Sequence, residues 1–138
     1  MELKGKSIQE LENDFWPDQK EYPTGLVERC HRYRKIKLKD LQIHQIITLL
    51  IQDIGSKYLM PIVLERMDND ISEEDGYDGS SFLESIDFFS DEIFKRNPEL
   101  YKAVLDLFNR KQKEIESIVG WKRHERILRR IQDKGIIK

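Results

Sequence analysis

The chain of 138 residues contains a single cysteine, Cys30, so it cannot form an internal disulfide bond. It also lacks any run that approaches the roughly 20 consecutive apolar residues of a membrane-spanning helix. The segment from Met1 to Lys6 has neither the apolar core nor the small-residue cleavage site of a secretory signal. These absences together predict a protein that works in the cytoplasm.

The sequence is equally poor in patterns that carry catalytic or metal chemistry. Cys30 and His31 are neighbours, and neighbouring helical side chains point about 100° apart, so they cannot act as a nucleophile and its base. We interpret Cys30 as a small core residue, His44 as a packed and hydrogen-bonded core residue, and His124 as a residue that faces water. The scattered histidines have no metal-ligand spacing, and no glycine-rich phosphate loop or Gly-x-Ser-x-Gly elbow is present. We therefore predict no enzymatic activity, no cofactor and no metal site.

One stretch begins like a calcium-binding loop, with Asp-Asn-Asp-Ile-Ser at residues 68–72. The match then fails, because the sixth position is Glu73 where a glycine is needed and the twelfth is Gly79 where a bidentate glutamate is needed. The sequence therefore argues against calcium binding.

An apolar fraction of 38% and a charged fraction of 36% are typical of a small helical protein whose helices each have one broad polar face. The most apolar segment, residues 40–54, is too long for an ordinary strand and is predicted to be a central helix. Other helix starts are indicated by local signals: the capping boxes Ser7–Glu10 and Ser81–Glu84, the caps Thr24 and Ser90, the break at Gly55, and Asn97-Pro98-Glu99. We predict an all-α fold in which residues 1–138 form one compact domain of about six to eight helices around the central apolar helix.

The C-terminal part is predicted to be a basic helical extension over about residues 98–135. A first helix runs from Pro98 to Gly120 and keeps its apolar residues on one face: Leu100, Val104, Leu107, Phe108, Ile115 and Ile118. A last helix follows Gly120, aligns Trp121, Leu128 and Ile131, and ends at Gly135.

Charge is segregated along the chain. Residues 67–94, here called the acidic segment, carry ten carboxylates and no lysine or arginine: Asp68, Asp70, Glu73, Glu74, Asp75, Asp78, Glu84, Asp87, Asp91 and Glu92. The formal charge of the whole chain is only −2, so the other 110 residues carry +8, with 24 basic and 16 acidic side chains. Such a segment is either a solvated loop and helix face, or a surface that a cationic partner covers.

The opposite charge gathers near the C-terminus, where residues 109–138 contain ten basic and four acidic side chains. A stripe of Lys122, Arg123, Arg126, Arg129 and Arg130 could follow phosphates, as in a small nucleic-acid-binding regulator. No aromatic platform is interleaved with the stripe, so a solvated helix face or an internal counterpart of the acidic segment is the preferred interpretation. A third possibility is a homodimer in which the acidic segment of one copy meets the basic helix of the other.

Several local patterns together carry a family resemblance. They are Ser7-Ile8-Gln9-Glu10-Leu11-Glu12 followed by Trp16-Pro17, then Tyr22-Pro23-Thr24-Gly25-Leu26-Val27-Glu28-Arg29-Cys30-His31, then Asp40-Leu41-x-Ile43 with Gln52-Asp53-Ile54-Gly55-Ser56-Lys57-Tyr58-Leu59-Met60-Pro61, then Asp75-Gly76-Tyr77-Asp78-Gly79 with Leu83, and Asn97-Pro98-Glu99-Leu100-Tyr101. Over about residues 7–101 the chain resembles the all-helical immunity proteins of bacterial contact-dependent growth inhibition (CDI) systems. The last third of the chain departs from the family, being longer and more basic, and the acidic run before Gly76 is enlarged.

The resemblance implies a non-enzymatic cytoplasmic inhibitor that binds the C-terminal toxin domain delivered by a neighbouring cell, often a nuclease. A nuclease site is positively charged because it holds phosphates, so an acidic face can occupy it and associate fast. We therefore predict a toxin-binding surface made of Asp70, Glu73, Glu74, Asp75, Tyr77, Asp78, Asp87 and Asp91. Tyr77, bracketed by glycines, is either an aromatic anchor for the toxin or packed back on its own domain. Trp16 is interpreted as a core residue.

Overall fold

The computed structural model describes residues 3–135 of the chain. These residues form nine α-helices: α1 (Ile8–Glu12), α2 (Gly25–Tyr33), α3 (Ile43–Ile51), α4 (Ser56–Asn69), α5 (Phe82–Ser85), α6 (Asp91–Arg96), α7 (Pro98–Arg110), α8 (Gln112–Val119) and α9 (Trp121–Gly135). Three short 3₁₀ helices accompany them: η1 (Leu3–Gly5), η2 (Leu38–Asp40) and η3 (Ile86–Phe88). The predicted all-α class is confirmed, since strand pairing in the described residues is limited to one isolated bridge between Ser7 and Lys37.

Most helices begin where the sequence predicts, because their first amides are satisfied locally. At α1, the Ser7 hydroxyl accepts from the Glu10 amide while the Glu10 carboxylate accepts from the Ser7 amide, which completes the capping box. Side-chain oxygens of Thr24, Ser81 and Asn97 cap α2, α5 and α7 in the same way. Local chemistry therefore sets these boundaries.

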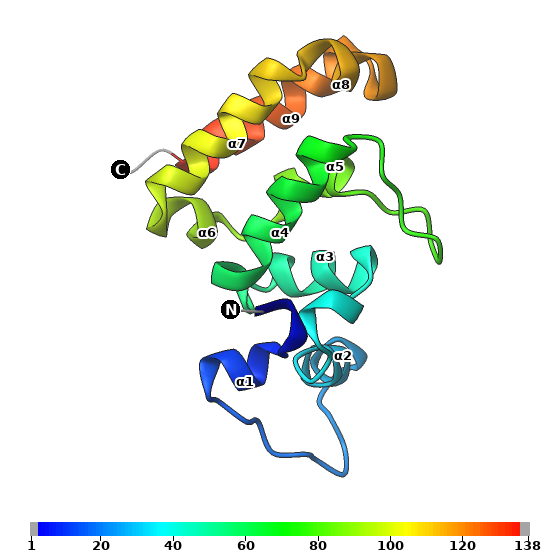
Figure 1. Cartoon of the computed structure of the whole chain (residues 1–138), viewed down its shortest axis with the longest axis vertical. Helices are drawn as coiled ribbons and strands as arrows, with labels where there is room; N and C mark the ends of the chain where they lie inside the picture. The colour runs from blue at the N-terminus through cyan, green and yellow to red at the C-terminus, as the bar shows by residue number, and fades with distance from the viewer. Residues whose placement is uncertain (1–2, 136–138) are drawn as a thin grey trace.

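The helices are arranged along a long axis. Figure 1 shows α1 and α2 at one end, α3 and α4 in the middle, and α7, α8 and α9 together at the other end. Helix α3 packs against α2, α4 and α5, and α4 continues the packing towards α7. Ile46, Leu49 and Leu50 of α3 are almost completely buried, so α3 is the central apolar helix that the sequence predicts. Apolar side chains from Ile8 to Ile131 contribute to the core.

The central helix is shorter than predicted, spanning residues 43–51 instead of 40–54. Gln42 closes a capping box with Gln45, which places the start after residue 41. At the other end, Asp53 and Gly55 adopt left-handed backbone angles, with φ of +56° and +66°. These angles end α3 and redirect the chain into α4.

The C-terminal layer departs from the prediction at two points. The segment expected as one helix is divided at Lys111, whose φ of −105° and ψ of +19° lie outside the helical region, into α7 and α8. Gly120, with a φ of +86°, then turns the chain so that α9 packs on α6, α7 and α8. The division adds a helix to the expected number.

Helix α9 buries a different stripe from the one predicted. Ile127 and Ile131 are fully buried together with His124, which is 3% exposed and lies against the Phe108 ring at a centroid distance of 6.0 Å. The expectation that His124 faces water is therefore wrong. Trp121, expected to align with the core, is 58% exposed. The buried stripe follows positions 124, 127 and 131, which a helix places on one face.

Two further residues complete the comparison with the sequence. Cys30 is buried, as predicted. Trp16 is only half-buried and stacks on the guanidinium of the buried Arg34, which lies 3.8 Å from the ring centroid, so it supports the loop before α2 instead of filling the core. None of the helices in residues 3–135 combines the length and apolarity needed to cross a membrane.

Candidate functional site

The predicted partner-binding residues fall into two groups in space. Six of them lie on the connection between α4 and α5, here called the acidic loop (residues 70–81): Asp70, Glu73, Glu74, Asp75, Tyr77 and Asp78. In Figure 1 this loop projects from the body of the molecule beside α3. The other two, Asp87 in η3 and Asp91 at the start of α6, lie against α9.

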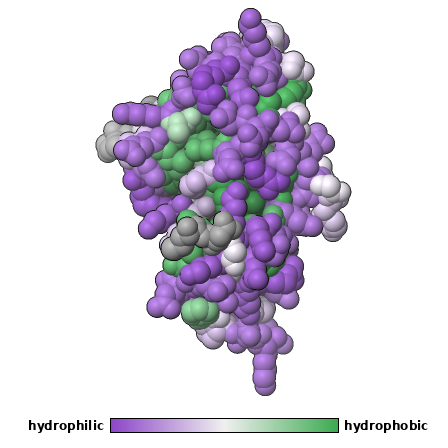
Figure 2. All heavy atoms as spheres, viewed as in Figure 1, coloured by the Kyte–Doolittle hydropathy of each residue, from purple (hydrophilic) through white to green (hydrophobic). Residues whose placement is uncertain are grey.

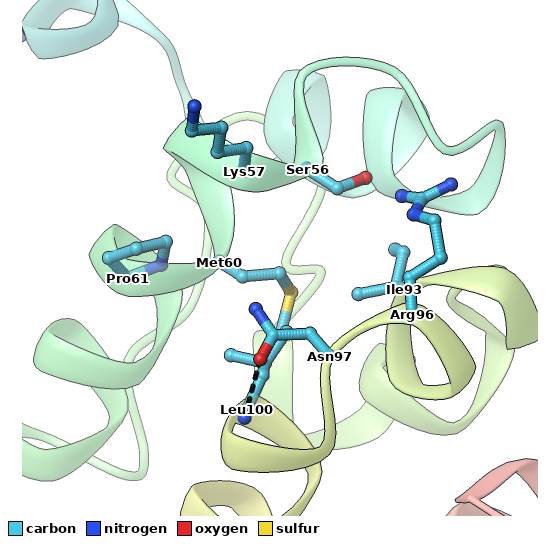
Figure 3. A pocket seen from close by; sticks show the side chains of 8 residues that line it. All are labelled: Ser56, Lys57, Met60, Pro61, Ile93, Arg96, Asn97 and Leu100. Carbon is cyan, nitrogen blue, oxygen red and sulfur yellow. Dashed lines mark hydrogen bonds between the residues drawn. The ribbon is translucent and has the colours of Figure 1, made fainter.

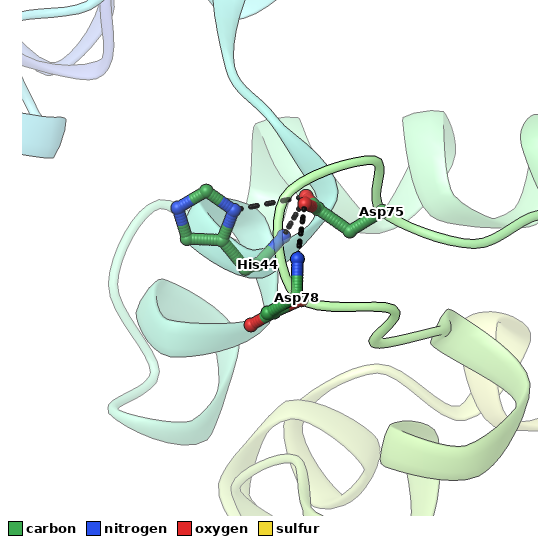
Figure 4. Close-up of side chains that lie close together, drawn as sticks. All are labelled: His44, Asp75 and Asp78. Atoms are coloured by element: carbon green, nitrogen blue, oxygen red, sulfur yellow. Dashed lines mark hydrogen bonds and ion pairs between the residues drawn. The ribbon is translucent and has the colours of Figure 1, made fainter.

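Asp75 is the anchor of the acidic loop. Its Oδ2 atom lies 2.9 Å from both the backbone nitrogen and the ring Nδ1 of His44, at the start of α3, and both nitrogens donate to it (Figure 4). Its Oδ1 atom accepts from the amides of Tyr77 at 2.7 Å and Asp78 at 3.3 Å. Only 6% of the residue is exposed. Asp75 therefore fixes the loop to α3 and offers almost no surface of its own.

Hydrogen bonding dominates the ionisation of Asp75. Burial alone would raise its pKa, but the hydrogen bonds from His44 and from the Tyr77 amide outweigh burial and lower the pKa to about 2. His44 is thereby hydrogen-bonded as predicted, although its side chain keeps 18% exposure. The loop is thus held by a carboxylate that stays ionised at neutral pH.

Two other carboxylates shape the loop while remaining exposed. Asp70 accepts from the amide and hydroxyl of Ser72 at 3.0 and 2.6 Å, and Asp78 accepts in the same way from Ser80 at 2.9 and 2.6 Å. Hydrogen bonds from these serines lower the pKa of Asp70 and of Asp78. In each case a single oxygen, Oδ1, accepts both bonds and organises a turn.

The two glutamates of the loop differ. Glu73 forms a two-pronged ion pair with Arg66 of α4, with distances of 2.9 and 2.7 Å, and is half-buried. Glu74 is exposed and has no ion-pair or hydrogen-bond partner among the described side chains. Glu73 therefore braces the loop, whereas Glu74 offers its carboxylate to solvent.

Tyr77 lies within the acidic loop with 81% of its surface exposed. Its ring is tilted over the ring of His44, at a centroid distance of 5.1 Å. This contact orients Tyr77 without burying it. A large exposed aromatic ring beside fixed carboxylates is the kind of surface that protein partners use as an anchor.

The carboxylates after the acidic loop pair with the basic C-terminal helix. Asp87, whose side chain is fully buried, lies 3.1 Å from Nη1 of Arg130, and Asp91 lies 2.6 Å from Nζ of Lys134. The hydrogen bond from Lys134 lowers the pKa of Asp91. This half of the acidic segment is therefore an internal counterpart of α9, and the buried Asp87 side chain is not available to a partner.

A cleft of about 480 Å³ opens between α2, α3 and the acidic loop. It is lined by Arg29, Arg32, Tyr33, His44, Gln45, Ile47, Thr48, Tyr77, Asp78 and Ser80. Sequence reasoning missed the two arginines. Their spacing of three residues on α2 places them on one helix face, but only the tertiary packing brings that face beside the loop.

The donor atoms of His44, Asp75 and Asp78 lie within 4.8 Å of one another. The hydrogen bonds that anchor the loop account for this closeness, because both oxygens of Asp75 accept from backbone or ring nitrogens (Figure 4). We assign no cation site to this cluster.

A second groove, of about 320 Å³, lies between α4, α6 and α7 (Figure 3). Two of its polar side chains already serve the fold: Arg96 binds Asp53 with distances of 2.6 and 2.8 Å, and Asn97 caps α7. Figure 2 shows that hydrophilic residues cover most of the face of the molecule that Figure 1 views, with smaller hydrophobic areas between them. The acidic loop and its cleft therefore remain the best candidate site.

Comparison with known protein families identifies a matching family model. The sequence model of the family described as CDI immunity proteins matches residues 10–104, which include the acidic segment and both walls of the cleft. No curated protein and no solved structure matches the chain. Helices α8 and α9 lie beyond the matched region.

Proposed function

The chain belongs to the family of CDI immunity proteins, and from this premise we propose that it neutralises its toxin through the acidic loop. Proteins of this family are toxin inhibitors without enzymatic activity, so the chain neutralises a cognate CDI toxin. The question that the geometry addresses is which surface meets that toxin.

The observation that carries the proposal is the shape and fixation of the acidic loop. Asp70, Glu74 and Asp78 are exposed on the same loop as Tyr77, which is 81% exposed. The four hydrogen bonds of Asp75 and the ion pair between Glu73 and Arg66 hold the loop in place. A surface ordered before binding loses less conformational entropy in the complex.

We further propose that the toxin surface is cationic, as in a nuclease that holds phosphates. Exposed carboxylates attract such a surface over distances near the Debye length, about 8 Å at physiological salt, and accelerate association. This proposal reduces the number of residues that are predicted to contact the toxin. Asp75 and Glu73 support the surface, Asp70, Glu74, Tyr77 and Asp78 form it, and Asp87 and Asp91 are engaged by α9. The encounter takes place in the cytoplasm, where nuclease substrates are found.

The alternatives drawn from the basic helix have less support. Arg123, Arg130 and Lys134 pair with acidic side chains of the same chain, which leaves a reduced basic face for nucleic acid. A homodimer would pair the acidic segment of one copy with the basic helix of the other, but these charges are already paired within one copy. Toxin neutralisation therefore explains more of the surface than a nucleic-acid-binding regulator does.

The test compares two charge reversals of equal size. One variant changes Asp70, Glu74 and Asp78 to lysine, and the control changes three exposed acids elsewhere, Glu92, Glu125 and Asp133, to lysine. Tyr77→Ala is tested separately. The partner is the cognate CDI toxin domain, used in co-expression survival assays and in measurements of association kinetics at low and high salt.

We expect the loop reversal to abolish protection and remove the salt dependence of association, while the control protects cells. Tyr77→Ala should lower affinity by about tenfold or more, as for an anchor residue, with an unchanged melting temperature. Full protection by a loop variant that is folded, with its salt dependence retained, would contradict the proposal. Circular dichroism melts of each variant separate lost binding from lost folding.

A further inference from the structure

Two arginines beside the acidic loop have no carboxylate partner. Arg29 and Arg32 are exposed on α2, and neither forms an ion pair within residues 3–135. Six other arginines of the chain each lie within ion-pair distance of an aspartate or glutamate: Arg34, Arg66, Arg96, Arg110, Arg123 and Arg130. Arg126 and Arg129 of α9 are also exposed and without an ion pair in the described residues, but they do not line the cleft. The guanidinium groups of Arg29 and Arg32 therefore keep their donors for another molecule.

Arg29 and Arg32 of α2 line the cleft described above and are here called its cationic wall, and Tyr77 and Asp78 of the acidic loop, which also line it, are called its anionic wall. The lining also includes the buried Tyr33 and Ile47, and His44, whose Nδ1 binds Asp75 while its other ring nitrogen points away from that carboxylate (Figure 4). The cleft thus combines a partly apolar floor, a cationic wall and an anionic wall. A volume of about 480 Å³ is in the range of sites that bind a drug-sized ligand.

The two walls restrict what can bind. A guanidinium binds a carboxylate through parallel hydrogen bonds, while the carbon chain of that residue can rest on Tyr33 and Tyr77. Asp78 lies in the same cleft, and its negative charge disfavours the binding of a group with two negative charges, such as a phosphate. A single carboxylate on a protein segment whose neighbouring residues are basic or neutral is repelled less. The chemistry therefore fits a protein segment with an acidic side chain better than a nucleotide.

We propose that this cleft receives an acidic side chain of the cognate toxin, with Arg29 and Arg32 as its ion-pair donors and Tyr77 and Asp78 as the anionic wall. The proposal rests on the proposed function and deepens it, because the cleft is continuous with the acidic loop. Recognition then uses both signs of charge. The carboxylates attract the cationic surface of the toxin, and the arginines bind one acidic side chain at a fixed position on that surface.

The chain offers a matched control for a test of the arginines. Arg126 and Arg129 have the same spacing on α9, are exposed, and also lack an ion-pair partner in the described part of the chain. We compare Arg29→Glu with Arg32→Glu in one variant against Arg126→Glu with Arg129→Glu in another. Affinity for the purified toxin domain is measured by calorimetry, and melting curves verify folding. If the cleft variant does not fold, Arg29→Gln with Arg32→Gln replaces it.

The expected result is a loss of affinity of about 30-fold or more in the cleft variant, because a bound toxin carboxylate then faces like charge, and less than about threefold in the control. Each acid of the toxin is next changed to lysine in turn. One such change should restore binding to the cleft variant and weaken binding to the parent protein.

The outcomes separate this inference from the proposed function. If the cleft variant binds like the control while the loop reversal described above fails to bind, the inference is wrong and the acidic loop still stands. If both variants bind normally, both proposals are wrong. Inorganic phosphate that competes with the toxin at Arg29 and Arg32, seen as matching shifts in NMR spectra, would also overturn the inference in favour of an anion site.

Discussion

The substitution Asp75→Asn isolates the anchor of the acidic loop. Both carboxylate oxygens accept from N–H groups, Oδ2 from His44 and Oδ1 from Tyr77 and Asp78. An asparagine in this position must turn its NH₂ group towards one of these donor sets, so donor meets donor in a buried place. The shape of the side chain is kept, and only its charge and its accepting capacity are lost.

The cost follows from the pKa. A change from the ordinary value of 3.8 to about 2 in the folded protein corresponds to about 2 kcal/mol of stability from the ionised carboxylate. Because the folded-state pKa is the lower one, this stability is fully present above about pH 4 and is lost as the pH falls towards 2. For a chain of this size we expect the melting temperature of Asp75→Asn at pH 7 to fall by roughly 6–8 °C.

Urea unfolding of both proteins from pH 7 to pH 2 tests this reasoning. The two unfolding free energies should differ by about 2 kcal/mol at pH 7 and approach each other as the pH falls to 2, where the Asp75 side chain of the parent is itself partly protonated. Asp133→Asn, an exposed substitution on α9, should leave the stability of the parent unchanged. A difference that stays constant over the whole pH range, or that is absent at pH 7, would refute the role given to Asp75.

Two other predictions follow from the contacts of α9. Arg130→Ala leaves the buried carboxylate of Asp87 without its cation and should lower the unfolding free energy by about 3 kcal/mol, measured by urea denaturation. The double variant Asp87→Asn with Arg130→Ala should lose less unfolding free energy than Arg130→Ala alone, because no buried charge remains unpaired. Because Arg123, Arg130 and Lys134 are paired internally, we expect no mobility shift of duplex DNA at about 150 mM salt and the same monomeric elution volume at low and high salt. A tight, salt-sensitive DNA complex would instead favour the regulator.

Local signals predict helix starts well in this chain. The first amides of α1, α2 and α7 are satisfied by Ser7, Thr24 and Asn97, all within three residues of the amide they serve. Such bonds can be read from spacing alone. The apolar run that becomes α3 is also predictable, because its composition indicates that it is buried.

Features that depend on tertiary packing escape such reasoning. The pairs of Asp87 with Arg130 and of Asp91 with Lys134 join residues 43 positions apart, so the sequence shows the charges but not which ones neutralise each other. The position of His124 was missed because its polarity suggested water, although its spacing from Ile127 and Ile131 fits the buried stripe. Placement of a face next to another element is a property of the whole fold.

The pairing of α9 also bears on how this protein relates to its family. The family match ends at residue 104, but α9 covers η3 and α6 and supplies the cation for the buried Asp87. A chain cut at the end of the match would expose apolar side chains and strand a charge in what had been its interior. The matched region therefore depends on helices beyond it for burial and for the cation of Asp87, even though those helices lie away from the proposed toxin-binding surface.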